Sequence, residues 1–253
     1  MSEFEGKKVF LTGAAGGIGF AVVKALLREG ATVLATDNSA GSLVELACDN
    51  LFARSLDVTN GADVERVIGE MDAQCGGIDF GVSVAGVLST TSIVETSDAE
   101  WERVFAVNVA GVFHVSRALA RHMVPRRKGS IVTVSSNAAG IPRKNMAAYA
   151  ASKAAATMFT RCLGLELAGY GIRCNIVAPG STLTPMQTGM WSDAHGGERV
   201  IEGSLENFKT GIPLRKLATP EDIANSILFL LSEKAGHITM ADIYVDGGAT
   251  LHA

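Results

Sequence analysis

A tyrosine and a lysine four positions apart are the residues of this sequence best suited to proton transfer. Tyr149 and Lys153 lie in an alanine-rich segment, and its composition and spacing predict a helix over residues 147–168. Positions i and i+4 share one face of a helix, so the phenol and the ammonium are within reach of one another. An unperturbed phenol has a pKa of about 10. We expect the neighbouring ammonium to lower the pKa of Tyr149 and make it a general acid or base near neutral pH.

A serine at the end of a predicted strand could complete this group. The β-branched apolar run at residues 131–134 predicts a buried strand that ends at Ser135 or Ser136. The carboxyl end of that strand could bring the Ser136 hydroxyl to the face that carries Tyr149, where it would hold the reacting oxygen. The Tyr-x-x-x-Lys spacing also occurs by chance in many helices, so the interpretation depends on the rest of the chain.

The glycine-rich segment 12–19 follows a short apolar strand and opens a helix. Strand, glycine turn and helix form the context that dinucleotide binding requires. Gly13, Gly17 and Gly19 permit a tight turn and the close approach of a pyrophosphate, whose charge is favoured at a helix N-terminus. The segment therefore predicts a dinucleotide site, although the glycine spacing differs from the common G-x-G-x-x-G.

An acidic residue after the second predicted strand indicates which dinucleotide is bound. Asp37 follows residues 31–36 and lies 18 positions beyond Gly19. A carboxylate at this place accepts hydrogen bonds from the ribose diol and repels a 2′-phosphate. We interpret Asp37 as selecting NAD over NADP; the alternative is that it caps the following helix.

Strands and helices alternate along the chain, which predicts an α/β fold. Strands are expected at residues 9–11, 31–36, 51–56, 78–84, 130–135, 172–178 and 238–245. Helices are expected at residues 20–28, 63–74, 99–123, 147–168 and 220–231, the last with Thr219 as cap and Pro220 at its first position. Right-handed crossovers then give one Rossmann-type, doubly wound parallel sheet with helices on both faces and ligands at the carboxyl ends of the strands.

The chain is expected to form a single NAD-binding domain over residues 1–253. Within it, residues 181–209 are glycine-containing and lack strong periodicity. We expect this segment to be a mobile substrate flap with one or two short helices.

Composition and charge exclude several classes of function. The net charge of −4 does not favour a nucleic-acid partner, and the apolar runs are too short to span a membrane. The N-terminal residues do not form a secretory signal, and the four cysteines lack C-x-x-C spacing, so reduced thiols in the cytoplasm are expected. The five histidines form no ligand pattern, so no metal site is predicted.

The sequence resembles the short-chain dehydrogenase/reductase family over essentially its whole length. The residues that carry the resemblance are the segment 12–19, Asp57-Val58, Asn108, Ser136, Tyr149 with Lys153, and Pro179-Gly180 with Thr184. The resemblance implies a Rossmann fold, NAD(P) binding and often a homotetramer. It also implies that Tyr149 transfers the proton and that Lys153 binds the nicotinamide ribose and lowers the tyrosine pKa. Ser136 would hold the substrate oxygen, and Asn108 would anchor a water relay that reaches Lys153.

The same resemblance implies the residues that contact the cofactor. They are Gly13, Gly17, Ile18, Gly19, Asp37, Asp57, Val58, Ala85, Gly86, Tyr149, Lys153, Thr182 and Thr184. One departure is the stretch Ser83-Val84-Ala85-Gly86, where the family usually has Asn-Asn-Ala-Gly. The asparagine that normally ties neighbouring strands is missing. This affects local bracing more than catalysis, because Ala85 and Gly86 would meet the cofactor through their backbone and small size.

A narrower resemblance is to family members that oxidise a ring hydroxyl of a dihydroxy-cyclohexadiene carboxylate with NAD and form an aromatic catechol for siderophore assembly. It is carried by residues 164–169, 173–175, 179–187 and 238–251. A dehydrogenase of a related acid, such as a dihydro-hydroxyanthranilate, and a general short-chain alcohol dehydrogenase remain open. An acyl-carrier reductase is disfavoured by Asp37. A non-catalytic NAD-binding regulator is disfavoured because such a protein has no need of Ser136, Tyr149 and Lys153.

Arg143 is the candidate that would bind the carboxylate of such a cyclic hydroxy acid. It lies between Ser136 and Tyr149, and a guanidinium can pair with a carboxylate through two parallel hydrogen bonds. The alternative is an exposed loop arginine. The apolar walls of the substrate pocket could come from Met146, Met186, Met190 and Trp191, which could equally be ordinary packing residues.

Overall fold

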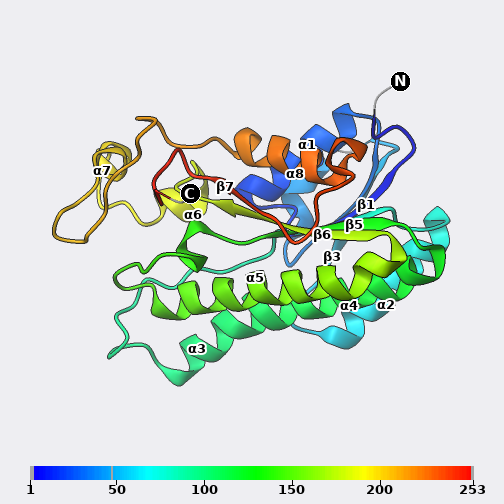
Figure 1. Cartoon of the computed structure of the whole chain (residues 1–253), viewed down its shortest axis with the longest axis horizontal. Coiled ribbons are helices and arrows are strands. Elements are labelled where there is room, and N and C mark those ends of the chain that lie inside the picture. Colours follow the sequence, from blue (N-terminus) through cyan, green and yellow to red (C-terminus); the bar gives the residue numbers. More distant parts are fainter. Residues whose placement is uncertain (1–2, 47, 252–253) are drawn as a thin grey trace.

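The protein is built on a parallel sheet whose strand order reverses once. The computed structural model describes residues 3–46 and 48–251. Its strands are β1 (Lys8–Thr12), β2 (Thr32–Asp37), β3 (Leu51–Ser55), β4 (Phe80–Ser83), β5 (Gly129–Val134), β6 (Ile172–Pro179) and β7 (Asp242–Val245). They are all parallel, in the order β3-β2-β1-β4-β5-β6-β7 (Figure 1). The winding changes direction between β1 and β4, which confirms the predicted doubly wound Rossmann-type sheet.

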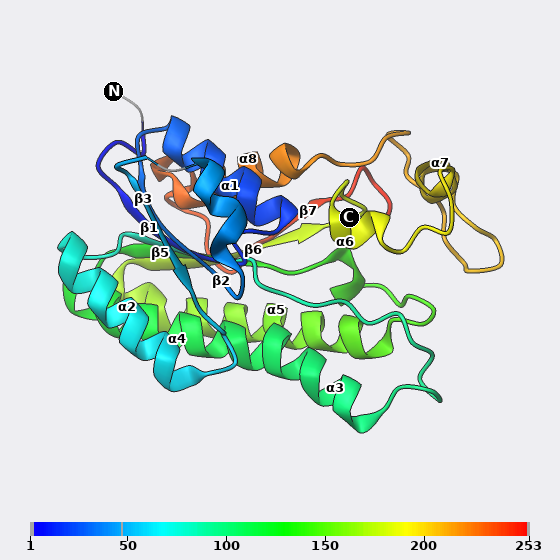
Figure 2. The same cartoon turned by 180° about the vertical axis from the view of Figure 1, so that it is seen from behind.

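Helices cover both faces of the sheet. They are α1 (Gly17–Arg28), α2 (Gly61–Cys75), α3 (Asp98–Phe105), α4 (Val112–Arg126), α5 (Ala147–Leu167), α6 (Pro185–Thr188), α7 (Gly196–Glu202) and α8 (Pro220–Leu231). The pair α1 and α8 packs on one face, and α2, α4 and α5 pack on the other (Figures 1 and 2). In the part of the chain that the structure describes, no helix is both long enough and apolar enough to cross a bilayer.

The alternation of side chains along each strand divides the core into two clusters. In β1, Val9 and Leu11 join the cluster under α1 and α8, whereas Phe10 joins the cluster under α2 and α4. Ile68 of α2 and Leu119 of α4 are fully buried in this second cluster. Both faces of a parallel sheet are covered in this way, so its strands appear in the sequence as nearly continuous apolar runs.

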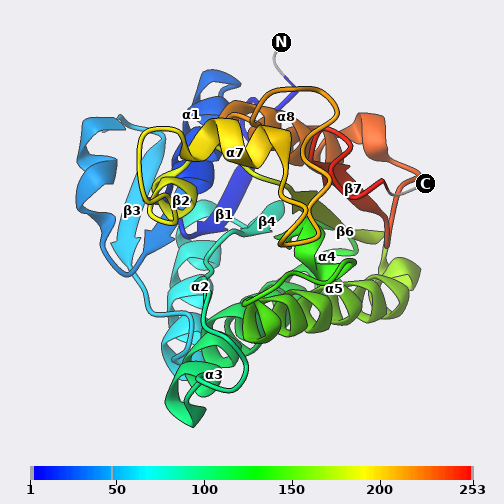
Figure 3. The same cartoon turned by 90° about the vertical axis from the view of Figure 1, so that its left-hand side faces the viewer.

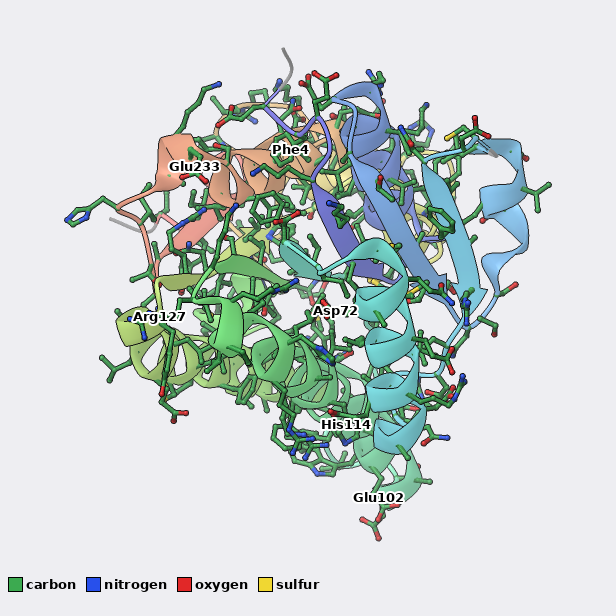
Figure 4. All side chains as sticks on the ribbon, turned by 90° about the vertical axis from the view of Figure 1, so that its right-hand side faces the viewer. Phe4, Asp72, Glu102, His114, Arg127 and Glu233 are labelled. Atoms are coloured by element: carbon green, nitrogen blue, oxygen red, sulfur yellow. The ribbon has the colours of Figure 1, made fainter. Side chains whose placement is uncertain are left out.

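Contacts at the amino edge of the sheet determine where β4 begins. Asp72 accepts a hydrogen bond from the backbone nitrogen of Ile78 at 2.7 Å, and its carboxylate also pairs with His122 at 3.1 Å. The strand predicted to begin at residue 78 therefore begins at Phe80. Figure 4 faces this edge, which also carries Phe4 and lies opposite the carboxyl ends of the strands.

The single long helix predicted over residues 99–123 is interrupted in the structure. Between α3 and α4 the backbone forms a π-helical turn, η2 (Ala106–Gly111), which carries Asn108. Such turns inside helices frequently occur at functional sites. The prediction of one continuous helix was wrong at this point, because contacts of Asn108 with distant segments determine the local backbone.

The last predicted strand, residues 238–245, is shorter than expected. The side chain of Asn175 donates a hydrogen bond to the Ile238 carbonyl at 2.9 Å and accepts one from the Ala241 nitrogen at 3.1 Å. These side-chain bonds stand beside two backbone bonds, from the Met240 nitrogen to the Cys174 carbonyl at 2.7 Å and from the Ile176 nitrogen to the Ala241 carbonyl at 2.9 Å. The regular strand β7 begins only at Asp242.

Two other local predictions are confirmed. α8 begins with Pro220 after the Thr219 cap, and Thr219 and Asp222 form a capping box. The segment of residues 181–209 contains the short helices α6 and α7. It lies beside the carboxyl ends of the strands, on the side of the molecule that faces the viewer in Figure 3.

Candidate active site

A cleft of about 580 Å³ opens at the C-terminal ends of the strands. Fifteen predicted site residues line it: Gly13, Gly17, Ile18, Gly19, Asp37, Asp57, Val58, Ala85, Gly86, Ser136, Arg143, Tyr149, Lys153, Thr182 and Thr184. Asn108 is the predicted site residue that does not line the cleft. The same cavity thus holds both the predicted cofactor residues and the predicted substrate residues.

The glycine turn after β1 leaves backbone groups open to a ligand. Gly13 has a φ of +69°, and a Cβ at this position would lie 2.5 Å from the Ala85 nitrogen. A Cβ on Gly17 would lie 2.8 Å from the methyl group of Thr184, so three loops approach closely here. The N-cap of α1, Gly16, provides no side-chain cap. The first amides of α1 are therefore available to an anion such as a pyrophosphate.

Asp37 ends β2 at the rim of the cleft. Its carboxylate accepts hydrogen bonds from the backbone nitrogens of Ala15 and Ser39, both at 3.1 Å. The bond from Ser39 closes a turn before the short helix η1 (Ala40–Leu46). The alternative that Asp37 caps the following helix therefore accounts for only one of its two carboxylate oxygens. An open helix N-terminus for a pyrophosphate and a fixed carboxylate for a ribose diol fit a nicotinamide dinucleotide.

The structure brings Ser136, Tyr149 and Lys153 together below the cleft surface. Their exposed fractions are 8%, 9% and 5%. The Ser136 hydroxyl forms a hydrogen bond with the Tyr149 phenol. The Lys153 ammonium donates a hydrogen bond to the Val134 carbonyl at 3.0 Å and lies 5.8 Å from the centre of the Tyr149 ring. The end of β5 and the first turns of α5 thus place a hydroxyl, a phenol and an ammonium around one position.

Burial dominates the ionisation of this group. It raises the pKa of the Tyr149 phenol, and the hydrogen bond with Ser136 opposes that shift. It also lowers the pKa of Lys153 to about 8. The expectation that Lys153 lowers the tyrosine pKa is therefore not met in this structure, because the ammonium is directed at the Val134 carbonyl. Both groups are shifted toward their neutral forms.

The side chain of Asn108 holds the loop after β4 through hydrogen bonds. Its Oδ1 accepts a hydrogen bond from the Val87 nitrogen at 2.8 Å, and its Nδ2 donates to the Val87 carbonyl at 2.9 Å and to the Ser152 hydroxyl at 3.0 Å. A second brace comes from β1, where the Thr12 carbonyl accepts from the Val84 nitrogen at 3.2 Å. These bonds hold the loop despite the asparagine missing from β4. The water relay assigned to Asn108 stays a prediction.

Several cleft residues come from aperiodic segments and were not predicted from the sequence. Lys209 and Gln187 line the cleft from the flap, and Leu88 lines it from the loop after β4. Neither spacing nor composition marks these residues, since their positions depend on how the flap and the loop fold. The predicted flap contains two basic residues, Arg199 and Lys209, and their charge is the signal that could have pointed to Lys209.

The suggested apolar walls are partly present. Met146, Met186 and Met190 line the cleft. Trp191 does not, because its ring packs over Gly196, where a Cβ would lie 2.2 Å from the indole. Three flexible thioethers can adapt to a flat ring, which suits a small cyclic substrate.

The fold and this cleft define a dinucleotide-binding oxidoreductase, and comparisons with known proteins specify the family. The family described as Enoyl-(Acyl carrier protein) reductase matches residues 13–250. The chain is 54% identical over 253 residues to the 2,3-dihydro-2,3-dihydroxybenzoate dehydrogenase of Bacillus subtilis (strain 168), covering 98% of this chain and 97% of that one. It is 44% identical over 251 residues to the vibriobactin-specific 2,3-dihydro-2,3-dihydroxybenzoate dehydrogenase of Vibrio cholerae, covering 96% of each.

A solved structure agrees with these relatives. The aldohexose dehydrogenase of Thermoplasma acidophilum, in ligand-free form, superimposes with a TM-score of 0.87 at 31% identity, covering 100% of this chain and 97% of that one. The protein belongs to the short-chain dehydrogenase/reductase family, whose members use NAD(P), and the resemblance seen in the sequence is confirmed.

We expect Tyr149→Phe to abolish most turnover while preserving the fold. The ring remains to fill its buried position, but the group that could carry the proton is gone. The kcat for oxidation of the alcohol substrate should fall by at least about 100-fold. NADH binding, followed by fluorescence, should stay close to that of the wild type. A near-normal kcat would contradict the assignment, and lost NADH binding would indicate a structural role.

We expect Asn108→Ala to destabilise the protein, because it leaves the Val87 nitrogen and carbonyl without partners. The free energy of unfolding, measured by urea titration, should fall by about 1–3 kcal/mol. Ser152→Ala is the comparison variant, since it leaves both Asn108 bonds to Val87 in place and removes the Asn108–Ser152 bond together with the Ser152 bond to the Tyr149 carbonyl. An unchanged free energy of unfolding in Asn108→Ala would show that the hydrogen bonds of Asn108 contribute little to stability.

Proposed function

We propose that this protein oxidises 2,3-dihydro-2,3-dihydroxybenzoate to 2,3-dihydroxybenzoate, with NAD as the acceptor, in the assembly of a catechol siderophore. The observation that carries the proposal is the 54% identity, over 98% of the chain, to the Bacillus subtilis dehydrogenase of that name. The residues of the cleft support it, because a phenol, a hydroxyl and an arginine line one cavity with three methionines.

The oxidation removes a hydride from a ring carbon and a proton from the hydroxyl on that carbon. NAD, when bound, accepts the hydride. Ser136 holds the reacting oxygen by a hydrogen bond, and Tyr149, in its phenolate form, takes the hydroxyl proton as the general base. Burial raises the pKa of Tyr149 and disfavours the phenolate, so this step depends on the positive charge of Lys153, 5.8 Å from the ring centre. Lys153 uses one of its three N–H donors on Val134 and has two left for a ribose hydroxyl. The cyclohexadienone that results tautomerises to the catechol, and aromatisation makes the overall step strongly downhill.

The carboxylate of this substrate requires a cation in the cleft. Arg143 is half-buried and lines the cleft. Burial lowers the pKa of Arg143, and the charge of Asp246 opposes that shift. A guanidinium loses its proton only in strongly alkaline solution, so it stays charged at neutral pH. Arg143 can therefore receive the carboxylate while the ring hydroxyls face Ser136 and Tyr149.

The preference for NAD is assigned to Asp37. Its two oxygens are oriented by Ala15 and Ser39, at the end of β2 where an adenosine ribose would lie. A ribose diol donates hydrogen bonds to such a carboxylate, whereas a 2′-phosphate would be repelled by it. The same carboxylate therefore both binds NAD and excludes NADP.

We infer a homotetramer located in the cytoplasm, with a flap that closes over the substrate. On α4 and α5 the apolar side chains of Phe113, Met158 and Leu165 are 38%, 55% and 70% exposed, a face that further copies would cover. The cysteines are free thiols, which suits a reducing compartment. Closure of residues 181–209 would exclude water from the cleft.

We expect Asp37→Asn to narrow the difference between NAD and NADP. The amide keeps the shape of the side chain but removes the charge that repels a 2′-phosphate. The ratio of kcat/KM values for the two cofactors, measured by NADH and NADPH absorbance, should fall toward one. An unchanged or larger ratio would show that another residue makes the selection.

We expect Arg143→Met to weaken recognition of the acid specifically. A charge-assisted pair is worth roughly 1.5–3 kcal/mol, so KM for the dihydrodiol acid should rise about ten- to a hundredfold. A cyclic alcohol without a carboxylate should be affected little. Lys144→Met is the matched control, because Lys144 is exposed and lies outside the cleft lining.

The assay for this variant also tests the proposed function. Purified wild-type protein with NAD should produce NADH faster from 2,3-dihydro-2,3-dihydroxybenzoate than from a dihydro-hydroxyanthranilate or simple cyclic alcohols. Faster turnover of another acid would reassign the substrate. Equal losses on the acid and the neutral alcohol would make Arg143 a structural residue.

A further inference from the structure

Lys209 is a further cationic residue of the cleft, besides Arg143 and Lys153. It lies at the end of a short hairpin in the flap, where its backbone nitrogen and carbonyl each form a 2.9 Å hydrogen bond with Ser204. These bonds fix the backbone, and the side chain lines the cleft together with Arg143. Within residues 3–46 and 48–251, the ammonium of Lys209 forms neither an ion pair nor a hydrogen bond. The residue is exposed, so its ammonium lies where the cleft opens to solvent and can be reached by an anion that enters it.

The two cations act on one another across the cleft. Burial and the positive charge of Arg143 both lower the pKa of Lys209. Like charges in one cavity are unfavourable, and an anion between them removes the repulsion. Figure 3 shows the flap extending over the loop that precedes α5, which carries Arg143. The two side chains thus approach the cleft from two different elements.

The fixed charges around Arg143 leave one positive charge unbalanced. Asp246 acts on Arg143, but its carboxylate already accepts bonds from the Thr250 nitrogen at 2.9 Å and the Thr250 hydroxyl at 2.5 Å. It therefore balances Arg143 through space only. The local charge of Arg143, Lys209 and the Asp246 carboxylate together is therefore +1. That charge matches a ligand with a single carboxylate.

We propose that Lys209 is a specificity-determining residue that binds the substrate carboxylate together with Arg143. The carboxylate then bridges the flap to the loop before α5. Arg143 offers a rigid, bidentate fork, and Lys209 adds a point charge that moves with the flap. Only an acidic substrate can form this bridge, so the same contact selects the acid and holds the flap over it. This inference rests on the proposed function, since it names the residues for the carboxylate of that substrate.

Binding of the product and of its neutral analogue tests the proposal. Calorimetry in the presence of saturating NAD compares 2,3-dihydroxybenzoate with 2,3-dihydroxybenzamide, which lacks the charge but keeps the ring. Lys209→Met should raise the Kd of the acid about tenfold and change that of the amide by less than about twofold. Lys209→Arg should restore most of the affinity for the acid. Lys216→Met is the control, because Lys216 is exposed and does not line the cleft.

A double variant tests whether both residues bind the same group. The double variant Arg143→Met/Lys209→Met loses some binding free energy for the acid. If Arg143 and Lys209 bind the same carboxylate, this loss should differ from the sum of the losses in the two single variants. Equal weakening of acid and amide in Lys209→Met, or an unchanged Kd for the acid, would overturn the proposal. Failure of the proposed function is separate, since it would appear as wild-type protein that does not oxidise the dihydrodiol acid.

Discussion

The hydrogen bond from the Lys153 ammonium to the Val134 carbonyl is the contact on which the arrangement of the site depends. A buried ammonium is costly unless its donors are satisfied, and this bond, 3.0 Å long, satisfies one of them at the end of β5. The neighbouring Ser135 hydroxyl donates to the Lys153 carbonyl at 3.2 Å and contacts the Thr157 hydroxyl at 2.6 Å. Helix α5 cannot slide along β5 without leaving these buried groups unpaired. Tyr149, one turn earlier in α5, is positioned as a consequence.

The other half of the cleft depends on how closely two backbone turns approach. At the reversal of strand order, Gly13 lies so near the Ala85 nitrogen that no side chain fits between them. The Thr12 hydroxyl accepts a hydrogen bond from the Ala85 nitrogen at 3.4 Å, which links the ends of β1 and β4. A dinucleotide that binds across these turns must end beside α5, since β5 is the neighbour of β4. The topology of the sheet therefore brings the cofactor and the Ser136–Tyr149–Lys153 group into one cavity.

Features encoded by local patterns could be predicted from the sequence, and features that depend on distant contacts could not. The apolar runs predicted the inner strands of the sheet, because both faces of a parallel sheet are buried there. The edge strands β3 and β7 contain no fully buried residue, and their bounds were predicted less well. The spacing of Tyr149 and Lys153 predicted a shared helical face. The π turn at Asn108 was missed because its geometry depends on Val87 and Ser152, which are remote in sequence. Ionisation was misjudged for a similar reason, since the pKa of Tyr149 follows from burial, which only the folded structure determines.

The charges along the cleft are arranged so that each ligand has one favourable orientation. Asp37 lies at the β2 end, whereas Arg143 and Lys209 enter from the loop before α5 and from the flap. A dinucleotide placed with its adenosine ribose at Asp37 leaves the cationic end for a second ligand. An acid bound in the reverse sense would lose its pairing with Arg143 and leave its carboxylate without a cation. A cyclic acid bound at Arg143 instead presents its hydroxyls toward Tyr149. If Arg143 and Lys209 bind the carboxylate as proposed, this separation of charge orients the substrate before any contact with the reacting oxygen is formed.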